Sequence, residues 1–96
     1  MNQEEVIKVE LPRFVEEMKS KLEFSKSKYG DFTQYRSQDF LYHFADEVKE
    51  LSVALAKGLG NSEKIRKEAV DVANMAFMLW WAHSEESTSG CINKMG

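Results

Sequence analysis

Apolar residues recur at helical spacing in three separate stretches of the chain. The first stretch begins at Pro12, stops at Gly30, and carries its apolar side chains roughly one helical turn apart (Phe14, Val15, Met18 and Leu22). Proline is favoured in the first turn of a helix, where its missing N–H needs no acceptor, and glycine is favoured just after the last turn. The pattern predicts a first helix between these two residues, preceded by a loose lead-in over residues 1–10.

The second stretch starts near Ser37, a favourable N-cap residue, with Asp39 where a first helical turn would place a negative charge. Gly58 and Gly60 end it, and its apolar stripe consists of Phe40, Phe44, Val48, Leu51 and Leu55. We expect a second helix between these boundaries. The aromatic and charged residues of 29–36 form a loop that connects it to the first helix.

The third stretch begins with Asn61 or Ser62 as the N-cap and continues to about His83, along a stripe made of Ile65, Ala69, Val72, Ala76 and Leu79. Residues off this stripe, including Val70, Phe77 and Trp81, are apolar too. Such a helix needs cover on several sides, which two other helices of one short chain hardly provide. We therefore expect a second subunit, and a symmetric dimer is the commonest form.

The composition agrees with a small helical protein. A chain of 96 residues forms one domain, which excludes multidomain enzymes. One Pro and five Gly are too few for a turn-rich sandwich or barrel. The fold class is therefore all-α: a helical bundle with three main helices per chain, completed by oligomerisation. We expect a helical domain over residues 11–83 and a poorly ordered polar tail over residues 84–96.

Charge and cysteine usage narrow the possible partners and compartments. The net charge of −3 is unfavourable for a nucleic-acid-binding protein. A single cysteine, Cys91, forms neither an internal disulfide nor a zinc site, which fits a reducing compartment. No signal-peptide pattern follows Met1, and the longest apolar run is too short to cross a membrane. We expect a soluble, cytoplasmic protein that binds neither nucleic acid nor membrane.

Two pairs of acidic residues are the candidate functional groups. Glu47 and Glu50 in the second helix, and Glu68 and Asp71 in the third, are each three residues apart and so share a helical face. Two antiparallel helices would bring these faces together. Because Glu47 and Glu68 border apolar stripes, the carboxylates lose hydration and repel one another, which a bound cation would offset. An all-oxygen ligand set favours Mg²⁺, with Mn²⁺ possible. The residues alone are equally compatible with a plain helical interaction module.

The sequence segments around these acidic pairs resemble those of a known family. Ala45-Asp46-Glu47-Val48-Lys49-Glu50-Leu51 and Lys67-Glu68-Ala69-Val70-Asp71-Val72-Ala73-Asn74 resemble the two signature blocks of the all-α nucleoside triphosphate pyrophosphohydrolase superfamily, in particular its MazG-like proteins. Upstream, Lys26-Ser27-Lys28-Tyr29-Gly30 is similar to the Lys-rich stretch of the short MazG-like proteins, although the following Asp31-Phe32 only approximates their Gly-Gly-Trp. The resemblance covers roughly residues 18–82.

The resemblance implies an activity and a set of site residues. Such enzymes use Mg²⁺ to cleave a (deoxy)nucleoside triphosphate between the α- and β-phosphates, which gives the monophosphate and pyrophosphate. The implied metal-binding and catalytic residues are Glu47, Glu50, Glu68 and Asp71, in a homodimer or a dimer of dimers. The alternatives are a phosphoribosyl-ATP pyrophosphohydrolase of the same superfamily and a non-catalytic helical dimer that acts as an interaction module.

Five further residues are candidates for substrate binding. Lys26 and Lys28 either bind phosphate or complement the helix dipole, and Lys64 either binds phosphate or forms an ion pair. Tyr29 either stacks on a base or covers the core. Asn74, which in the family lies near the nucleotide sugar or base, could instead form an interhelical hydrogen bond. His43, one turn before Glu47, is either a phosphate contact, a base or an ordinary helix-face histidine.

Overall fold

The computed structural model describes residues 1–84, and these residues form helices and no strand. The elements are α1 (Gln3–Tyr29), η1 (Phe32–Gln34), α2 (Ser37–Lys57), η2 (Leu59–Asn61) and α3 (Ser62–Ala82), where η marks a single 3₁₀ turn. The predicted all-α class with three main helices is confirmed. Apart from Ser84, the predicted polar tail lies outside the described residues.

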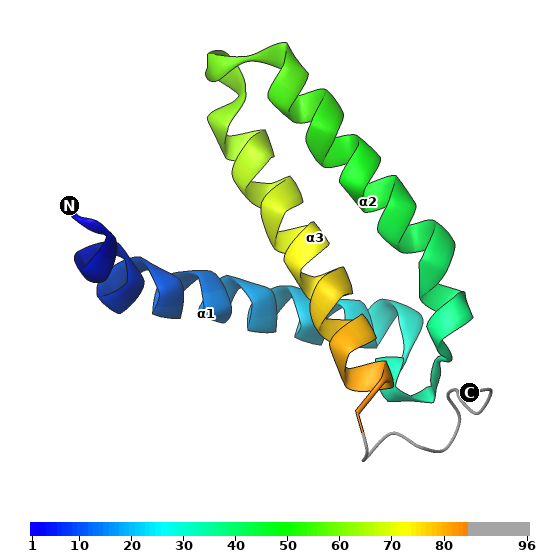
Figure 1. Cartoon of the computed structure of the whole chain (residues 1–96). Helices are drawn as coiled ribbons and strands as arrows, with labels where there is room; N and C mark the ends of the chain where they lie inside the picture. The colour runs from blue at the N-terminus through cyan, green and yellow to red at the C-terminus, as the bar shows by residue number, and fades with distance from the viewer. Residues whose placement is uncertain (85–96) are drawn as a thin grey trace.

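The three helices form a hairpin and a crossing arm. Helices α2 and α3 run side by side in opposite directions and are joined by η2, while α1 crosses α3 near the end of the hairpin opposite η2 (Figure 1). The N-terminal half of α1 extends beyond the hairpin (Figure 1). No residue of α1 is buried. The packed part of the chain is therefore the hairpin, together with the loop that leads into it.

The start of α1 corrects the prediction for residues 1–10. The Glu5 N–H donates to Asn2 Oδ1 at 2.9 Å, and the Asn2 N–H donates to Glu5 Oε1 at 3.0 Å. This reciprocal capping box satisfies two backbone donors that a helix start leaves free, so α1 begins at Gln3. The expected loose lead-in is wrong as local structure, and Pro12 lies inside the helix rather than in its first turn.

The remaining helix boundaries follow the predictions closely. Gly30 and Gly58 end α1 and α2 with φ values of 90° and 96°, a region that favours glycine. At the start of α2 the N-cap is Arg36, whose N–H donates to Asp39 Oδ2 at 2.8 Å. The predicted cap, Ser37, instead forms a 2.6 Å hydrogen bond with His83 Nε2, which joins the start of α2 to the end of α3.

The core is small and lies between α2 and the C-terminal half of α3. Its buried members are Phe40, Met75 and Ala82, and the partly buried side chains packed against them are Phe32, Phe44, Met78 and Leu79. Two aromatic side chains of α3 stay outside: Phe77 is 38% exposed and Trp80 is 71% exposed. None of the helices in residues 1–84 is long and apolar enough to cross a membrane.

Candidate metal and ligand site

Three of the four predicted acids meet across the hairpin. Glu47 and Glu50 come from α2 and Glu68 from α3, and one carboxylate oxygen of each lies within 4.8 Å of the others. Glu68 is only 5% exposed, Glu47 is half-buried and Glu50 is exposed. The three-residue spacing in α2 and the antiparallel pairing of α2 with α3 together produce this group, which we call the carboxylate group.

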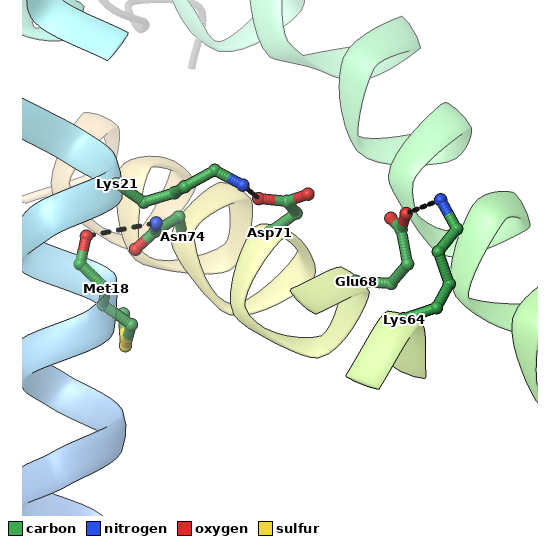
Figure 2. A network of polar contacts seen from close by, with 6 residues as sticks. All are labelled: Met18, Lys21, Lys64, Glu68, Asp71 and Asn74. Atoms are coloured by element: carbon green, nitrogen blue, oxygen red, sulfur yellow. Dashed lines mark hydrogen bonds and ion pairs between the residues drawn. The ribbon is translucent and has the colours of Figure 1, made fainter. Parts of the chain in front are cut away.

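Asp71 stands apart from the carboxylate group because a lysine of α1 holds it. Lys21 Nζ donates to Asp71 Oδ1 at 2.7 Å, and Figure 2 shows this side chain reaching from α1 across to α3. Asp71 is nevertheless near enough for its charge to help raise the pKa of Glu47. The fourth predicted acid therefore borders the site while it is paired with Lys21.

Lys64 pairs with the buried acid of α3. Its Nζ lies 2.8 Å from Glu68 Oε2, one helical turn away (Figure 2). The hydrogen bond and the charge of Glu68 raise the pKa of Lys64 above its usual value. Of the two roles considered for Lys64, the structure thus shows the ion pair.

The surroundings of the carboxylate group destabilise the ionised form of Glu47. Burial, followed by the charges of Asp71, Glu50 and Glu68, raises the pKa of Glu47 to about 7, and the nearby Lys21 partly opposes this rise. Glu47 Oε1 and Glu68 Oε1 are both buried and accept no hydrogen bond from residues 1–84. Buried carboxylate oxygens without partners are unfavourable, and hard divalent cations bind such oxygens well. The donor set therefore fits Mg²⁺ or Mn²⁺.

A cavity of about 470 Å³ adjoins these acids. Its volume lies in the range of small-molecule sites, and its wall is built from the end of α1, the following loop, α2 and α3. Acidic groups of the lining come from Glu23, Asp31, Glu47 and Asp71, and basic groups come from Lys21 and Lys26. Much of the remaining wall is aromatic or sulfur-containing, from Tyr29, Phe32, Tyr35, Phe40, Met75 and Met78. Carboxylates, ammonium groups and ring faces thus border one space.

Three of the five predicted substrate-binding residues line the cavity. Lys26, Tyr29 and Asn74 line it, whereas Lys28 and Lys64 lie outside its lining. Lys28 Nζ lies over the Tyr29 ring, 5.4 Å from its centroid. Asn74 is buried and its Nδ2 donates to the Met18 carbonyl oxygen at 3.2 Å, so the expected interhelical hydrogen bond is present (Figure 2). His43 also lines the cavity.

Lys21 is a residue of the site that the sequence analysis missed, whereas Tyr35 belongs to the aromatic loop that it expected. Lys21 lies between Met18 and Leu22, so it borders the apolar stripe of α1, and that position was the available signal. Tyr35 closes the loop, because its hydroxyl donates to the Tyr29 carbonyl oxygen at 2.7 Å. This contact joins two residues of the loop that lines the cavity, and the sequence carries no pattern that indicates it.

Comparisons of the chain with protein-family models, curated proteins and solved structures found no match. The case for a function therefore rests on the site and on the resemblance of its motifs.

Proposed function

We propose that the protein is a Mg²⁺-dependent nucleotide pyrophosphohydrolase that cleaves a (deoxy)nucleoside triphosphate between the α- and β-phosphates. The observation that carries the proposal is the carboxylate group, with two buried and unpartnered oxygens, beside a cavity that lysines and aromatic rings line. A nucleotide needs a metal for its phosphates, cations for their remaining charge and a ring face for its base. The resemblance of the two acidic motifs to the MazG-like proteins adds to the same proposal.

Each residue type has a role in this reaction. Glu47, Glu50 and Glu68 would hold Mg²⁺, together with Asp71 once it leaves Lys21. Bound Mg²⁺ would neutralise phosphate charge and make a bound water more acidic. Lys26 would contact phosphate oxygens, and Tyr29 would offer its ring to the base. Water would attack the α-phosphorus, the bond to the bridging oxygen would break, and pyrophosphate would leave while a carboxylate takes the proton of the water.

The decisive experiment measures pyrophosphate release from a panel of ribo- and deoxyribonucleoside triphosphates and phosphoribosyl-ATP, with Mg²⁺ and with a chelator. We expect Mg²⁺-dependent release from at least one nucleotide. Preference for phosphoribosyl-ATP would favour the alternative enzyme of the same superfamily. No release from any member of the panel would contradict the proposal and favour a non-catalytic interaction module.

We also propose that the chain works as a homodimer or a dimer of dimers. The supporting observation is the aromatic surface of α3: the rings of Phe77 and Trp80 stack with centroids 6.1 Å apart and remain exposed on a single chain. Exposed apolar patches of this kind commonly mark interfaces. Sedimentation at micromolar concentration should give a dimer or larger, and Trp80→Glu should shift it toward the monomer. A monodisperse 11.1 kDa monomer of the unaltered protein would contradict this proposal.

A further inference from the structure

The two site acids of α3, Glu68 and Asp71, are each paired with a lysine, and the two lysines are placed differently. Lys64 is on α3 itself, binds Glu68 at 2.8 Å, and lies outside the lining of the cavity. Lys21 comes from α1, binds Asp71 at 2.7 Å, and lines the cavity (Figure 2). Of these two lysines, therefore, only Lys21 both pairs with an acid of the site and lines the space for a ligand.

The ion pair between Lys21 and Asp71 is weak enough for another cation to replace Lys21. The two side chains are 44% and 25% exposed, so water screens their attraction and the pair is weak. A lysine carries a point charge on a flexible stem and can move its ammonium group by rotating side-chain bonds alone. Asp71 meanwhile lies beside the carboxylate group without joining it. The ammonium group of Lys21 supplies a positive charge at Asp71.

We propose that Lys21 is an exchangeable counter-ion, which neutralises Asp71 until a divalent cation binds the carboxylate group, then releases Asp71 and binds a phosphate of the ligand in the cavity. This inference rests on the proposed function. A divalent cation attracts Asp71 and repels the ammonium group, so both effects favour release. The cavity that Lys21 lines also contains Lys26, beside four acids (Glu23, Asp31, Glu47 and Asp71). The freed ammonium group would offset part of this negative charge and act with a second cation on an anionic ligand.

The exchange predicts opposite effects of one substitution on two affinities. Lys21→Met removes the competitor for Asp71, so the cation should bind more tightly. The same substitution removes a contact to phosphate, so the anionic ligand should bind more weakly. A residue that only holds α1 in place would weaken both when it is replaced. A residue without a role would change neither.

The test uses calorimetry on the full chain with Mn²⁺ alone, and then with a nonhydrolysable α,β-methylene nucleoside triphosphate at saturating Mn²⁺. For Lys21→Met we expect about fivefold tighter Mn²⁺ binding, because the cation no longer competes with one partly exposed ion pair. We expect about tenfold weaker binding of the nucleotide analogue, because a charge-assisted hydrogen bond is lost. The matched control, Lys64→Met, should tighten Mn²⁺ binding and leave the analogue affinity unchanged.

The outcomes separate this inference from the proposed function. If the unaltered protein binds no Mn²⁺, both are overturned. If it binds Mn²⁺ but Lys21→Met changes neither affinity, or lowers both, the inference alone is overturned. Should Lys21→Met fail to fold, Lys21→Gln removes the charge while its amide can still contact Asp71. The same opposite shifts are then required of that variant.

Discussion

The α2–α3 hairpin and helix α1 contribute to the site in different ways. The hairpin contains the buried residues of the described chain, and the carboxylate group bridges its two helices. Helix α1 buries none of its residues, and its polar contacts with α3 include the pair between Lys21 and Asp71 and the hydrogen bond from Asn74 to the Met18 carbonyl. The candidate metal ligands therefore sit on the packed helices, and part of the cavity wall sits on a helix with no buried residue.

The difference teaches where the site is rigid and where it can adjust. Moving α2 against α3 would open the apolar core, which is costly because burial of each large side chain contributes about 2 kcal/mol. Exchanging a screened ion pair between α1 and α3 costs far less. We therefore expect changes in the hairpin to alter the chemistry and changes in α1 to alter ligand binding. Four predictions test this division, from the largest effect to the smallest.

Amide substitutions in the hairpin should nearly abolish activity. Glu50→Gln, Glu68→Gln and Asp71→Asn keep the side-chain shape and remove one negative charge from the site. Loss of about 3 kcal/mol of transition-state stabilisation lowers kcat more than a hundredfold. The exposed neighbour Asp46 provides the control, because Asp46→Asn should keep full activity. Full activity in Glu50→Gln and Asp71→Asn would remove the basis for calling this protein a pyrophosphohydrolase.

The stability of the metal-free protein should fall as the pH rises from 4.5 to about 7. The pKa of Glu47 is raised from 4.5 to about 7 in the folded chain, so the folded state holds a proton that the unfolded state has lost. The contribution of Glu47 to the free energy of unfolding is fully present below pH 4.5 and is lost as the pH rises from 4.5 to about 7.

Glu47→Gln should remove this pH dependence. In metal-free buffer at pH 8, we expect its Tm to exceed that of the unaltered protein by about 5 °C, the shift that roughly 1 kcal/mol makes in a domain of this size. At pH 4 the substitution should leave Tm unchanged. Equal Tm differences at both pH values would mean that Glu47 is not destabilised by ionisation.

In α1, the two lysines of the last turn should behave differently. Lys26 lines the cavity and Lys28 does not, although both lie on the same helical turn. Lys26→Ala should raise KM about fivefold with little change in kcat, because a contact to phosphate is lost. Lys28→Ala is the matched control and should change KM less than twofold. Equal effects of the two substitutions would indicate a general effect of charge rather than a contact in the cavity.

Removing residues 1–10 should have the smallest effect. Residues 1–9 are exposed and Glu10 is half-buried, so the truncation uncovers little apolar surface. The shortened helix would begin at Leu11-Pro12, and proline is favoured near a helix start. We expect Tm within about 3 °C of the unaltered protein, as for ordinary surface changes, and an unchanged kcat. A large fall in Tm would show that the arm has a packing partner and that the contrast between hairpin and α1 is overstated.

Local sequence patterns were sufficient for much of the fold and for the helical faces that carry Glu47, Glu50 and Glu68. Helical spacing of apolar residues located the helices, and the glycines at 30 and 58 marked two of their ends because their φ values are positive. The spacing of the acids placed Glu47 and Glu50 on one face, and the short connection forced α3 back beside α2. The larger of two local errors, at residues 1–10, came from the Asn2–Glu5 capping box, which the prediction of a helix start at Pro12 left out. The other was the N-cap of α2, which is Arg36 rather than Ser37.

The partners of the acids depended instead on how distant segments pack. Lys21 and Asp71 are fifty residues apart, and nothing in the spacing of either helix specifies where α1 crosses α3. The crossing selects Lys21 as the partner of Asp71, brings Lys26 to the cavity and leaves Lys28 outside it. The raised pKa of Glu47, about 7, likewise depends on tertiary packing, because burial and the charges of Asp71 and Glu68 on α3 add to that of Glu50, while Lys21 of α1 opposes the rise. Periodicity assigns a residue to a face of its own helix, but burial and charge pairing depend on the atoms of other helices that pack against that face.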